Sequence, residues 1–211
     1  MPIFNNNYQT ESMRIPSKKA CYHLIYEMEM MDHIVSHSIL VCQVATLLVE
    51  HLYLQNIYLN REVIQASALL HDITKTRSFK TRENHAQTGE QLLRDLNYPE
   101  VGDIIGQHVV LDVYVFSESP NEMEIVNYAD KRVLHDRVVS LKDRMTYVLK
   151  KYGKKSVHHE RIFRLWEESE QLEKKIFATL SFSPDDLNDL LDPDTLKKEL
   201  LSYRKACTQL E

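Results

Sequence analysis

The sequence predicts an all-α fold, and three observations support this prediction. Apolar residues recur at helical spacing through long segments, most clearly over residues 32–53. Glycine is scarce, with 4 in 211 residues, which disfavours a β-rich fold with many tight turns. Hydrophobic residues make up 43% of the chain, enough to form a buried core. We therefore expect a bundle of packed helices.

A polar arm and three helices are predicted for the first part of the chain. Residues 1–14 are polar and rich in asparagine, so we expect a flexible arm. Ser17 follows a proline and is a typical N-cap, which predicts a first helix reaching about Met30. Apolar spacing predicts a second helix over Asp32–Tyr53. Asn60 is a suitable cap for the third helix.

The middle of the chain alternates polar and helical segments. Thr74–Asn84 is polar and is predicted to be a loop, and a fourth helix begins near His85. A short helix is predicted over Val101–Val109. Leu111–Phe116 is rich in β-favouring residues and is predicted to be an extended connector. The next helix begins around Glu122 and carries Asp130 near its end.

The last third is highly charged but regularly patterned. Val138–Tyr152 and Val157–Leu180 are predicted to be amphipathic helices, separated at Gly153. Ser183-Pro184 and Asp192-Pro193 each place a cap before a proline, which is typical of short helices. We therefore divide the chain into an arm at 1–14, a helical domain at 15–135, and a C-terminal helical extension at 136–211 that packs on the same core.

Several classes of function are disfavoured by composition. A formal net charge of −5 argues against binding a nucleic-acid duplex, and no glycine-rich phosphate-binding loop is present. The cysteines, Cys21, Cys42 and Cys207, are odd in number and form no CxxC motif, which favours a reducing compartment. We find no leader sequence and no apolar run approaching a membrane span. We expect a cytoplasmic protein without a membrane partner, and a homodimer is left open.

The segment ALLHDITK, around His71 and Asp72, holds the most informative residues. An adjacent histidine and aspartate end a predicted helix whose other residues are small or apolar. Burying such a pair is costly unless a partner compensates for the lost hydration. A divalent metal ion would use both side chains, although a hydrogen-bonded structural pair is the alternative. Lys75 follows one turn later, where its charge could face an anionic substrate.

Further imidazoles and carboxylates interrupt the apolar faces of other predicted helices. The full candidate metal-binding set is His37, His71, Asp72, His85, His108 and Asp130. One ion would be held by His37, His71, Asp72 and Asp130. This mixed nitrogen and oxygen set suits Fe, Mn, Co, Ni or Zn in preference to Mg. A second ion would bind His85 and His108, with the Asp72 carboxylate as the bridge.

The ordered pattern resembles the HD-domain superfamily of metal-dependent phosphohydrolases. The segments that carry the likeness are HSILVCQVA at His37, ALLHDITK at His71, ENHAQTGEQLL at His85, NYADKRV at Asp130 and DRVVSLKDR at 136–144. The chain looks most similar to small, stand-alone bacterial HD hydrolases. The resemblance implies an HD-domain helical bundle with a C-terminal helical extension. It also implies metal ligation by the candidate set, with one or two divalent transition-metal ions.

The expected activity is hydrolysis of a phosphate ester or anhydride in a nucleotide or related small molecule. A metal-bound hydroxide would attack phosphorus, with Asp72 and Lys75 as the catalytic residues. Lys75 resembles the lysine that follows the His-Asp pair in the family. Basic residues beside a metal site attract phosphates, so Lys75, Arg77 and Arg132 are expected to bind the substrate.

Two departures from the family pattern are visible, and two other functions stay open. Thr74 stands where many relatives have glycine after His-Asp-Ile. Val109 stands where the HD-GYP branch has a second histidine, and no GYP segment exists, which disfavours cyclic-di-GMP hydrolysis by that branch's mechanism. The same ligands would serve a di-iron oxygenase, which some members of this superfamily are. A regulatory module that binds a nucleotide without turnover is the third possibility.

Overall fold

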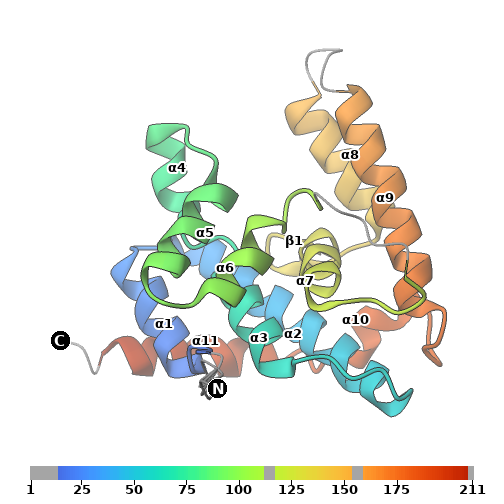
Figure 1. The fold of residues 1–211 in the computed structure, drawn as a ribbon, viewed down its shortest axis with the longest axis horizontal. Helices are drawn as coiled ribbons and strands as arrows, with labels where there is room; N and C mark the ends of the chain where they lie inside the picture. The colour runs from blue at the N-terminus through green and yellow to red at the C-terminus, as the bar shows by residue number, and fades with distance from the viewer. Residues whose placement is uncertain (1–13, 112–116, 154–158, 209–211) are drawn as a thin grey trace, which may run out of the picture.

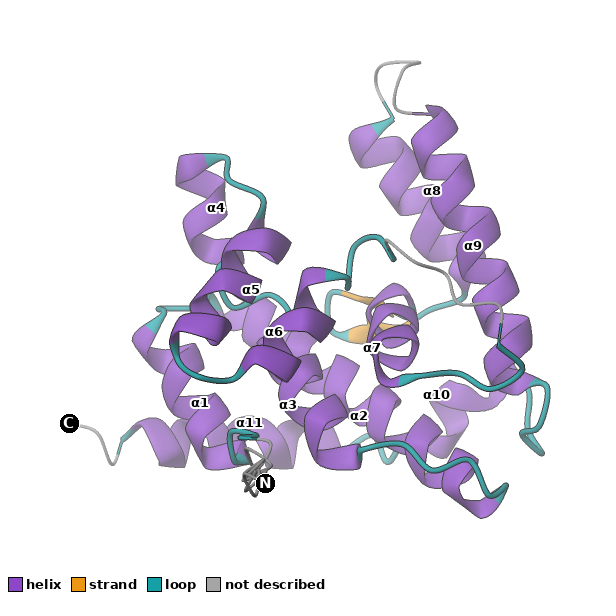
Figure 2. Cartoon of the chain, in the orientation of Figure 1, coloured by secondary structure: helices purple, strands orange, loops and turns teal. Residues whose placement is uncertain are grey.

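In a computed structural model of the chain, residues 14–111, 117–153 and 159–208 are described, and the predicted all-α fold is confirmed. Helices dominate, joined by loops and one small hairpin (Figure 2). The helices are α1 (Lys18–Glu27), α2 (Asp32–Leu54), α3 (Arg61–Leu70), α4 (Lys75–Thr81), α5 (His85–Asp95), α6 (Pro99–Gly106), α7 (Glu122–Lys131), α8 (Leu141–Tyr152), α9 (His159–Phe177), α10 (Leu187–Leu190) and α11 (Thr195–Cys207). A 3-10 turn, η2 (Pro184–Asp186), precedes α10, and strands β1 (Val133–Leu134) and β2 (Arg137–Val138) form the hairpin.

Helix α2 lies at the centre of the core. Its apolar residues are buried on several sides because α2 contacts α3, α7 and α11. By length and composition α2 could also cross a membrane, which differs from our expectation that no segment approaches that hydrophobicity. However, 67% of its most apolar 18-residue stretch is buried inside the protein. Packing within the fold therefore accounts for the apolar character of α2.

The predicted helix caps are present and fix where the helices begin. Ser17 Oγ accepts a hydrogen bond from the Ala20 amide at 3.2 Å, and Asn60 Oδ1 accepts one from the Val63 amide at 3.2 Å. Each cap satisfies an amide that has no partner within its helix. Asn84 caps α5 in the same way, so that His85 becomes the first residue of that helix.

The segment after the third helix differs from the prediction, because residues 75–81 of the predicted loop form helix α4. Helix α4 has no buried face, because none of its residues is buried. The sequence therefore carries no apolar periodicity from which this helix could be predicted. The helical path continues out of α3 through a turn in which the Lys75 amide donates to the Asp72 carbonyl oxygen at 2.9 Å. Arg82, with a left-handed φ of 62°, then ends α4.

The hairpin also differs from the prediction, which began a helix at Val138. Val133 pairs with Val138 in an antiparallel register, and His135 adopts a left-handed φ of 58° in the turn. Two residues per strand are too few to show alternation. Helix α8 therefore begins only at Leu141, with Ser140 as its cap. The predicted arm and extended connector fall largely on residues 1–13 and 112–116, which lie outside the described residues.

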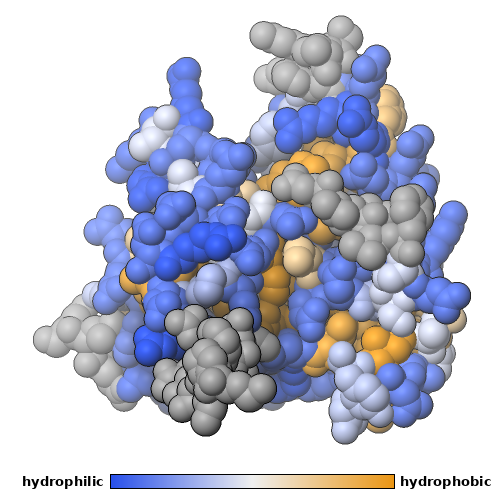
Figure 3. All heavy atoms as spheres, viewed as in Figure 1, coloured by the Kyte–Doolittle hydropathy of each residue, from blue (hydrophilic) through white to orange (hydrophobic). Residues whose placement is uncertain are grey.

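The C-terminal third contributes to the same core as the rest of the chain. Leu172, Ile176 and Leu187 are buried within the main apolar cluster. Helices α8 and α9 pair and project from the body on the same side as α4, while α11 lies beside α1 (Figure 1). The face in this view is mostly hydrophilic, with apolar side chains visible toward its middle (Figure 3). The division of the chain near residue 135 stays a prediction.

Candidate metal centre

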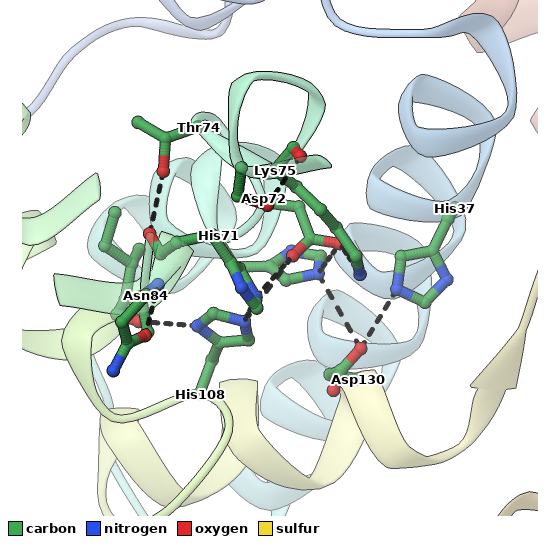
Figure 4. A network of polar contacts seen from close by, with 12 residues as sticks. His37, His71, Asp72, Thr74, Lys75, Asn84, His108 and Asp130 are labelled. Atoms are coloured by element: carbon green, nitrogen blue, oxygen red, sulfur yellow. Dashed lines mark hydrogen bonds and ion pairs between the residues drawn. The ribbon is translucent and has the colours of Figure 1, made fainter. Parts of the chain in front are cut away.

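Five helical segments bring the six predicted ligands together. His37 lies within α2, His71 and Asp72 follow α3, His85 begins α5, His108 follows α6, and Asp130 lies near the end of α7. Helix α3 contacts α2, α6 and α7, so its C-terminal end meets the ligand-bearing parts of those helices. The side chains drawn in Figure 4 from α2, α3, α6 and α7 converge on a common centre. Packing of apolar faces thus places the polar residues opposite one another.

The first group of ligands surrounds Asp130. His37 Nε2 lies 2.9 Å from Asp130 Oδ1, and His71 Nε2 lies 3.7 Å from the same oxygen (Figure 4). His71 Nε2 also lies 3.4 Å from Asp72 Oδ2. All four side chains are buried. The candidate ligand atoms of His37, His71 and Asp72 lie within 4.8 Å of one another, a spacing that could hold one ion.

The second group lies on the other side of Asp72. Asp72 Oδ1 is 3.3 Å from His85 Nε2 and 3.5 Å from His108 Nε2, and the two imidazole nitrogens are 3.1 Å apart. These three ligand atoms also lie within 4.8 Å of one another. Each oxygen of the Asp72 carboxylate therefore faces a different group of histidines. A carboxylate in this position can bridge two ions.

Backbone carbonyls orient the two buried imidazoles. The Nδ1 of His71 lies 2.8 Å from the Ala68 carbonyl oxygen, and the Nδ1 of His108 lies 2.6 Å from that of Ile105. A carbonyl oxygen accepts only, so we assign the proton of each neutral ring to Nδ1. The Nε2 lone pairs then point into the centre. This arrangement is typical of metal-binding histidines.

Two buried polar atoms at the centre have no hydrogen-bond partner among the described residues. They are His71 Nε2 and Asp72 Oδ1. Leaving such atoms unsatisfied costs roughly 1–3 kcal/mol each. Both are acceptors in the protonation states described here, so a cation would satisfy both at once. The residues present therefore fit a divalent metal.

The centre keeps its carboxylates ionised. Burial alone would raise the pKa of Asp72, but favourable interactions of the ionised carboxylate with its neighbours, among them the Lys75 ammonium, outweigh burial and hold that pKa well below its usual value. The pKa of Asp130 is also lowered, because His37 and Arg144 outweigh the effect of burial. Ionised carboxylates are the form that binds metal.

Lys75 is ion-paired with the centre. Its Nζ donates to Asp72 Oδ2 at 2.6 Å, and its side chain is 31% exposed. Burial favours the neutral amine, but Asp72 and Asp130 outweigh this and raise the pKa of Lys75. Lys75 is therefore a fixed positive charge next to the Asp72 carboxylate, where it can contact an anion bound there.

The two arginines predicted to bind substrate occupy different environments. The structure contradicts the prediction for Arg132, which is buried with its guanidinium donating to the carbonyls of Val139 and Pro184, the Tyr128 hydroxyl and the Glu173 carboxylate. Proximity to Asp130 in sequence was misleading, because residues two positions apart on a helix point in different directions. Arg77 is half exposed on α4 and pairs with Glu83, so its role stays a prediction.

Arg144, on α8, is a site residue that the sequence analysis did not single out. Its Nη2 lies 3.7 Å from Asp130 Oδ1, and its side chain is 18% exposed. The segment containing it contributed to the family resemblance, but its spacing to the ligands is long and gave no sign of contact. Only the packing of α8 through Leu141 and Met145 brings Arg144 to the centre.

Residues beside the ligands also fix their positions. Asn127 Nδ2 donates to the carbonyl oxygens of Gln107 and His108 at 2.8 and 3.1 Å. Lys131 Nζ lies 3.4 Å from the same His108 oxygen and 2.5 Å from Asn127 Oδ1. Burial lowers the pKa of Lys131 to about 8. Helix α7 therefore supplies Asp130 to one group and holds His108 of the other.

Comparison with known proteins identifies one family. The model of the family described as the HD domain matches residues 34–148, which is more than half of the chain. The matched region contains all six candidate ligands together with Lys75 and Arg144. Neither the comparison with curated proteins nor that with solved structures gave a match.

Proposed function

Because the chain belongs to the HD-domain family, we propose that it is a metal-dependent phosphohydrolase acting on a nucleotide or related phosphate ester or anhydride. The observation that carries this proposal is the placement of Asp72, whose two carboxylate oxygens face two separate groups of histidines. A centre of this kind can hold two ions against the oxygens of one phosphoryl group.

Each residue of the centre would have a separate role in binding metal or substrate. His37, His71, Asp72 and Asp130 would hold one ion, and Asp72, His85 and His108 would hold the other. When bound, divalent ions lower the pKa of water at the site and polarise phosphoryl oxygens. Lys75, fixed against Asp72 at 2.6 Å, offsets negative charge that develops on the phosphoryl group. The mixed imidazole and carboxylate set favours Fe, Mn, Co, Ni or Zn.

The expected setting is a cytoplasm containing small phosphorylated metabolites. The three cysteines are free and buried, which supports a reducing compartment. The net charge of −5 supports a small anionic substrate at a local cationic site in preference to a nucleic-acid duplex. We propose no membrane partner, and light scattering on the purified chain distinguishes a monomer from a homodimer.

The test is an Asp72→Ala variant of the full chain. We expect it to keep its helical circular dichroism, to lose both ions, and to lose turnover of phosphorylated metabolites by more than about a hundredfold, because even partners outside the ligand set are worth that much. Metal content is measured by elemental analysis. Asp95→Ala, an exposed aspartate on α5, is the matched control. Wild-type metal content in Asp72→Ala would remove the bridging role.

Turnover under anaerobic conditions separates the hydrolase from an oxygenase with the same ligands. Phosphate release without oxygen supports the proposal. Oxygen consumption without phosphate release, across a panel of nucleotides and sugar phosphates, would contradict it.

A further inference from the structure

The Arg144 guanidinium has no hydrogen-bond acceptor among the described residues. Its closest acidic atom is Asp130 Oδ1, and 3.7 Å is too long for a hydrogen bond. That oxygen is already contacted by His37 Nε2 at 2.9 Å. The neighbouring cations are committed, since Lys75 donates to Asp72 and Arg132 donates to several acceptors. Arg144 therefore differs from every other cation at the centre.

The position of Arg144 is imposed by the fold. Ser140 caps α8, and its carbonyl oxygen accepts the Arg144 amide at 3.0 Å. Leu141 and Met145 are buried and set which face of α8 meets the body. A guanidinium does not lose its charge at physiological pH, and it carries five N–H donors in one plane. With 18% of its side chain exposed, it has lost most of its hydration without gaining an acceptor.

The charges at the centre indicate which kind of ligand Arg144 would bind. Lys75 and Arg144 together balance the charges of Asp72 and Asp130. A divalent ion bound to the histidines would therefore give the centre a net positive charge. A bound dianion would neutralise that charge. Two parallel N–H groups of one guanidinium match two oxygens of a phosphoryl group. Lys75 and Arg144 come from α4 and α8, which project from the same side of the molecule (Figure 1).

We propose that Arg144 binds the substrate directly, donating two hydrogen bonds to the terminal phosphoryl group of a dianionic phosphate monoester held at the metal centre. This inference rests on the proposed function and narrows its substrate class. A monoester dianion has three unesterified oxygens, enough for Arg144 and the metal centre together. A diester is a monoanion with two such oxygens and would leave part of the charge unmatched.

The test measures binding of inorganic phosphate to the Mn²⁺-loaded full chain by calorimetry at neutral pH. Arg144→Ala should raise the phosphate dissociation constant at least about tenfold, since hydrogen bonds to charged groups are strong. Arg144→Lys keeps the charge but not the planar pair of donors, so it should fall between. Lys142→Ala, which removes an exposed cation two residues away on α8, should bind phosphate within about twofold of wild type.

Metal content distinguishes substrate contact from support of Asp130. We expect both Arg144 variants to retain wild-type manganese. Phosphate affinity unchanged in Arg144→Ala would overturn the inference, and so would a parallel loss of manganese and phosphate in both variants. Turnover is scored separately: a wild-type protein that binds phosphate through Arg144 yet hydrolyses no phosphate ester would contradict the proposed function and support this inference.

Discussion

Asp72 is the residue through which the two halves of the candidate centre meet. Its Oδ2 faces His71 and Lys75, and its Oδ1 faces His85 and His108. Removing this one side chain affects four neighbours at once, whereas loss of any single histidine affects one group. Energies of such coupled residues are not additive.

Thr74 is expected to control the second group of ligands. Its Oγ1 donates to the His85 carbonyl oxygen at 2.8 Å, and it is fully buried. Thr74→Val keeps the shape but removes this donor, so His85 is held less firmly at the start of α5. We expect affinity for the second metal ion to fall about tenfold, as for other partners that orient ligands. Calorimetric titration with Mn²⁺ measures each site.

Thr74→Ser is the matched control, because it retains the hydroxyl. The first ion should bind normally in both variants, since Thr74 has no described contact with His37 or Asp130. Two ions bound with wild-type affinity by Thr74→Val would show that the hydroxyl has no positioning role.

Which site residues the sequence could reveal depended on the pattern around each one. His37, His71 and Asp130 interrupt apolar helical faces, so their burial could be predicted and the structure brings them together. Arg144 could not be predicted, because it sits in a charged amphipathic segment in which most cations face solvent. Arg132 misled us for the opposite reason: it lies two residues from a candidate ligand in sequence, but its guanidinium pairs with Glu173 on α9.

At the scale of elements, α9 holds the helix that carries Asp130. Lys175 Nζ lies 2.8 Å from Glu124 Oε2, with the Glu124 side chain 1% exposed. A second contact joins Glu173 to Arg132 and to the Tyr128 hydroxyl. In each ion pair, one partner lies on α9 and the other lies on α7 or directly after it. The extension therefore acts on the metal centre through the placement of α7.

Lys175→Met should destabilise the protein strongly. It leaves the Glu124 carboxylate buried without its cation, and breaking one side of a buried pair costs about 3–5 kcal/mol. We expect the free energy of unfolding, measured by urea titration, to fall by that amount. Lys174→Met alters an exposed neighbour on the same helix and should change it by less than about 0.5 kcal/mol.

The double variant Glu124→Gln/Lys175→Met removes both charges and should recover part of the loss. If Lys175→Met alone is as stable as the wild type, the pair does not fix α9 to α7.

The elements that the sequence failed to reveal share one physical property. Helix α4 buries none of its residues, and the hairpin has two residues in each strand, so neither leaves a periodic apolar pattern. The long buried helices and their caps, such as α2 and the Asn60 cap of α3, were predicted because burial and capping both restrict residue type.

At the scale of the whole molecule, the last helix is joined to the first described one. Glu199 on α11 accepts hydrogen bonds from the Tyr22 hydroxyl at 2.6 Å and contacts Lys18 Nζ at 2.5 Å. The Tyr22 and Tyr203 rings meet edge to face with centroids 5.5 Å apart. These contacts connect residues more than 170 positions apart in sequence.

Stability should depend on pH through Glu199. Burial tends to raise its pKa, but hydrogen bonds from Lys18 and Tyr22 outweigh this and lower it from 4.5. A lowered folded-state pKa means that the stabilisation is present above about pH 4.5 and is lost as the pH falls through the lower, folded-state value. Because Lys18 is half exposed, solvent screening limits the gain at neutral pH to about 1 kcal/mol.

Glu199→Gln should therefore be less stable than the wild type at pH 7, with the difference shrinking toward about pH 3. Thermal unfolding of both proteins across this range measures it. Glu170→Gln, on the exposed face of α9, is the control. A difference that stays constant with pH would show that the ionised carboxylate is not the source of the stabilisation.

Helix α2 also has a consequence for synthesis on the ribosome. Its apolar surface is covered by α7 and α11, and α11 ends about 150 residues after α2. At roughly 5–20 residues per second, synthesis of α2 is complete some 8 to 30 seconds before its last covering helix has been translated. The apolar faces of α2 that α7 and α11 cover in the folded protein are therefore without those two partners during that interval.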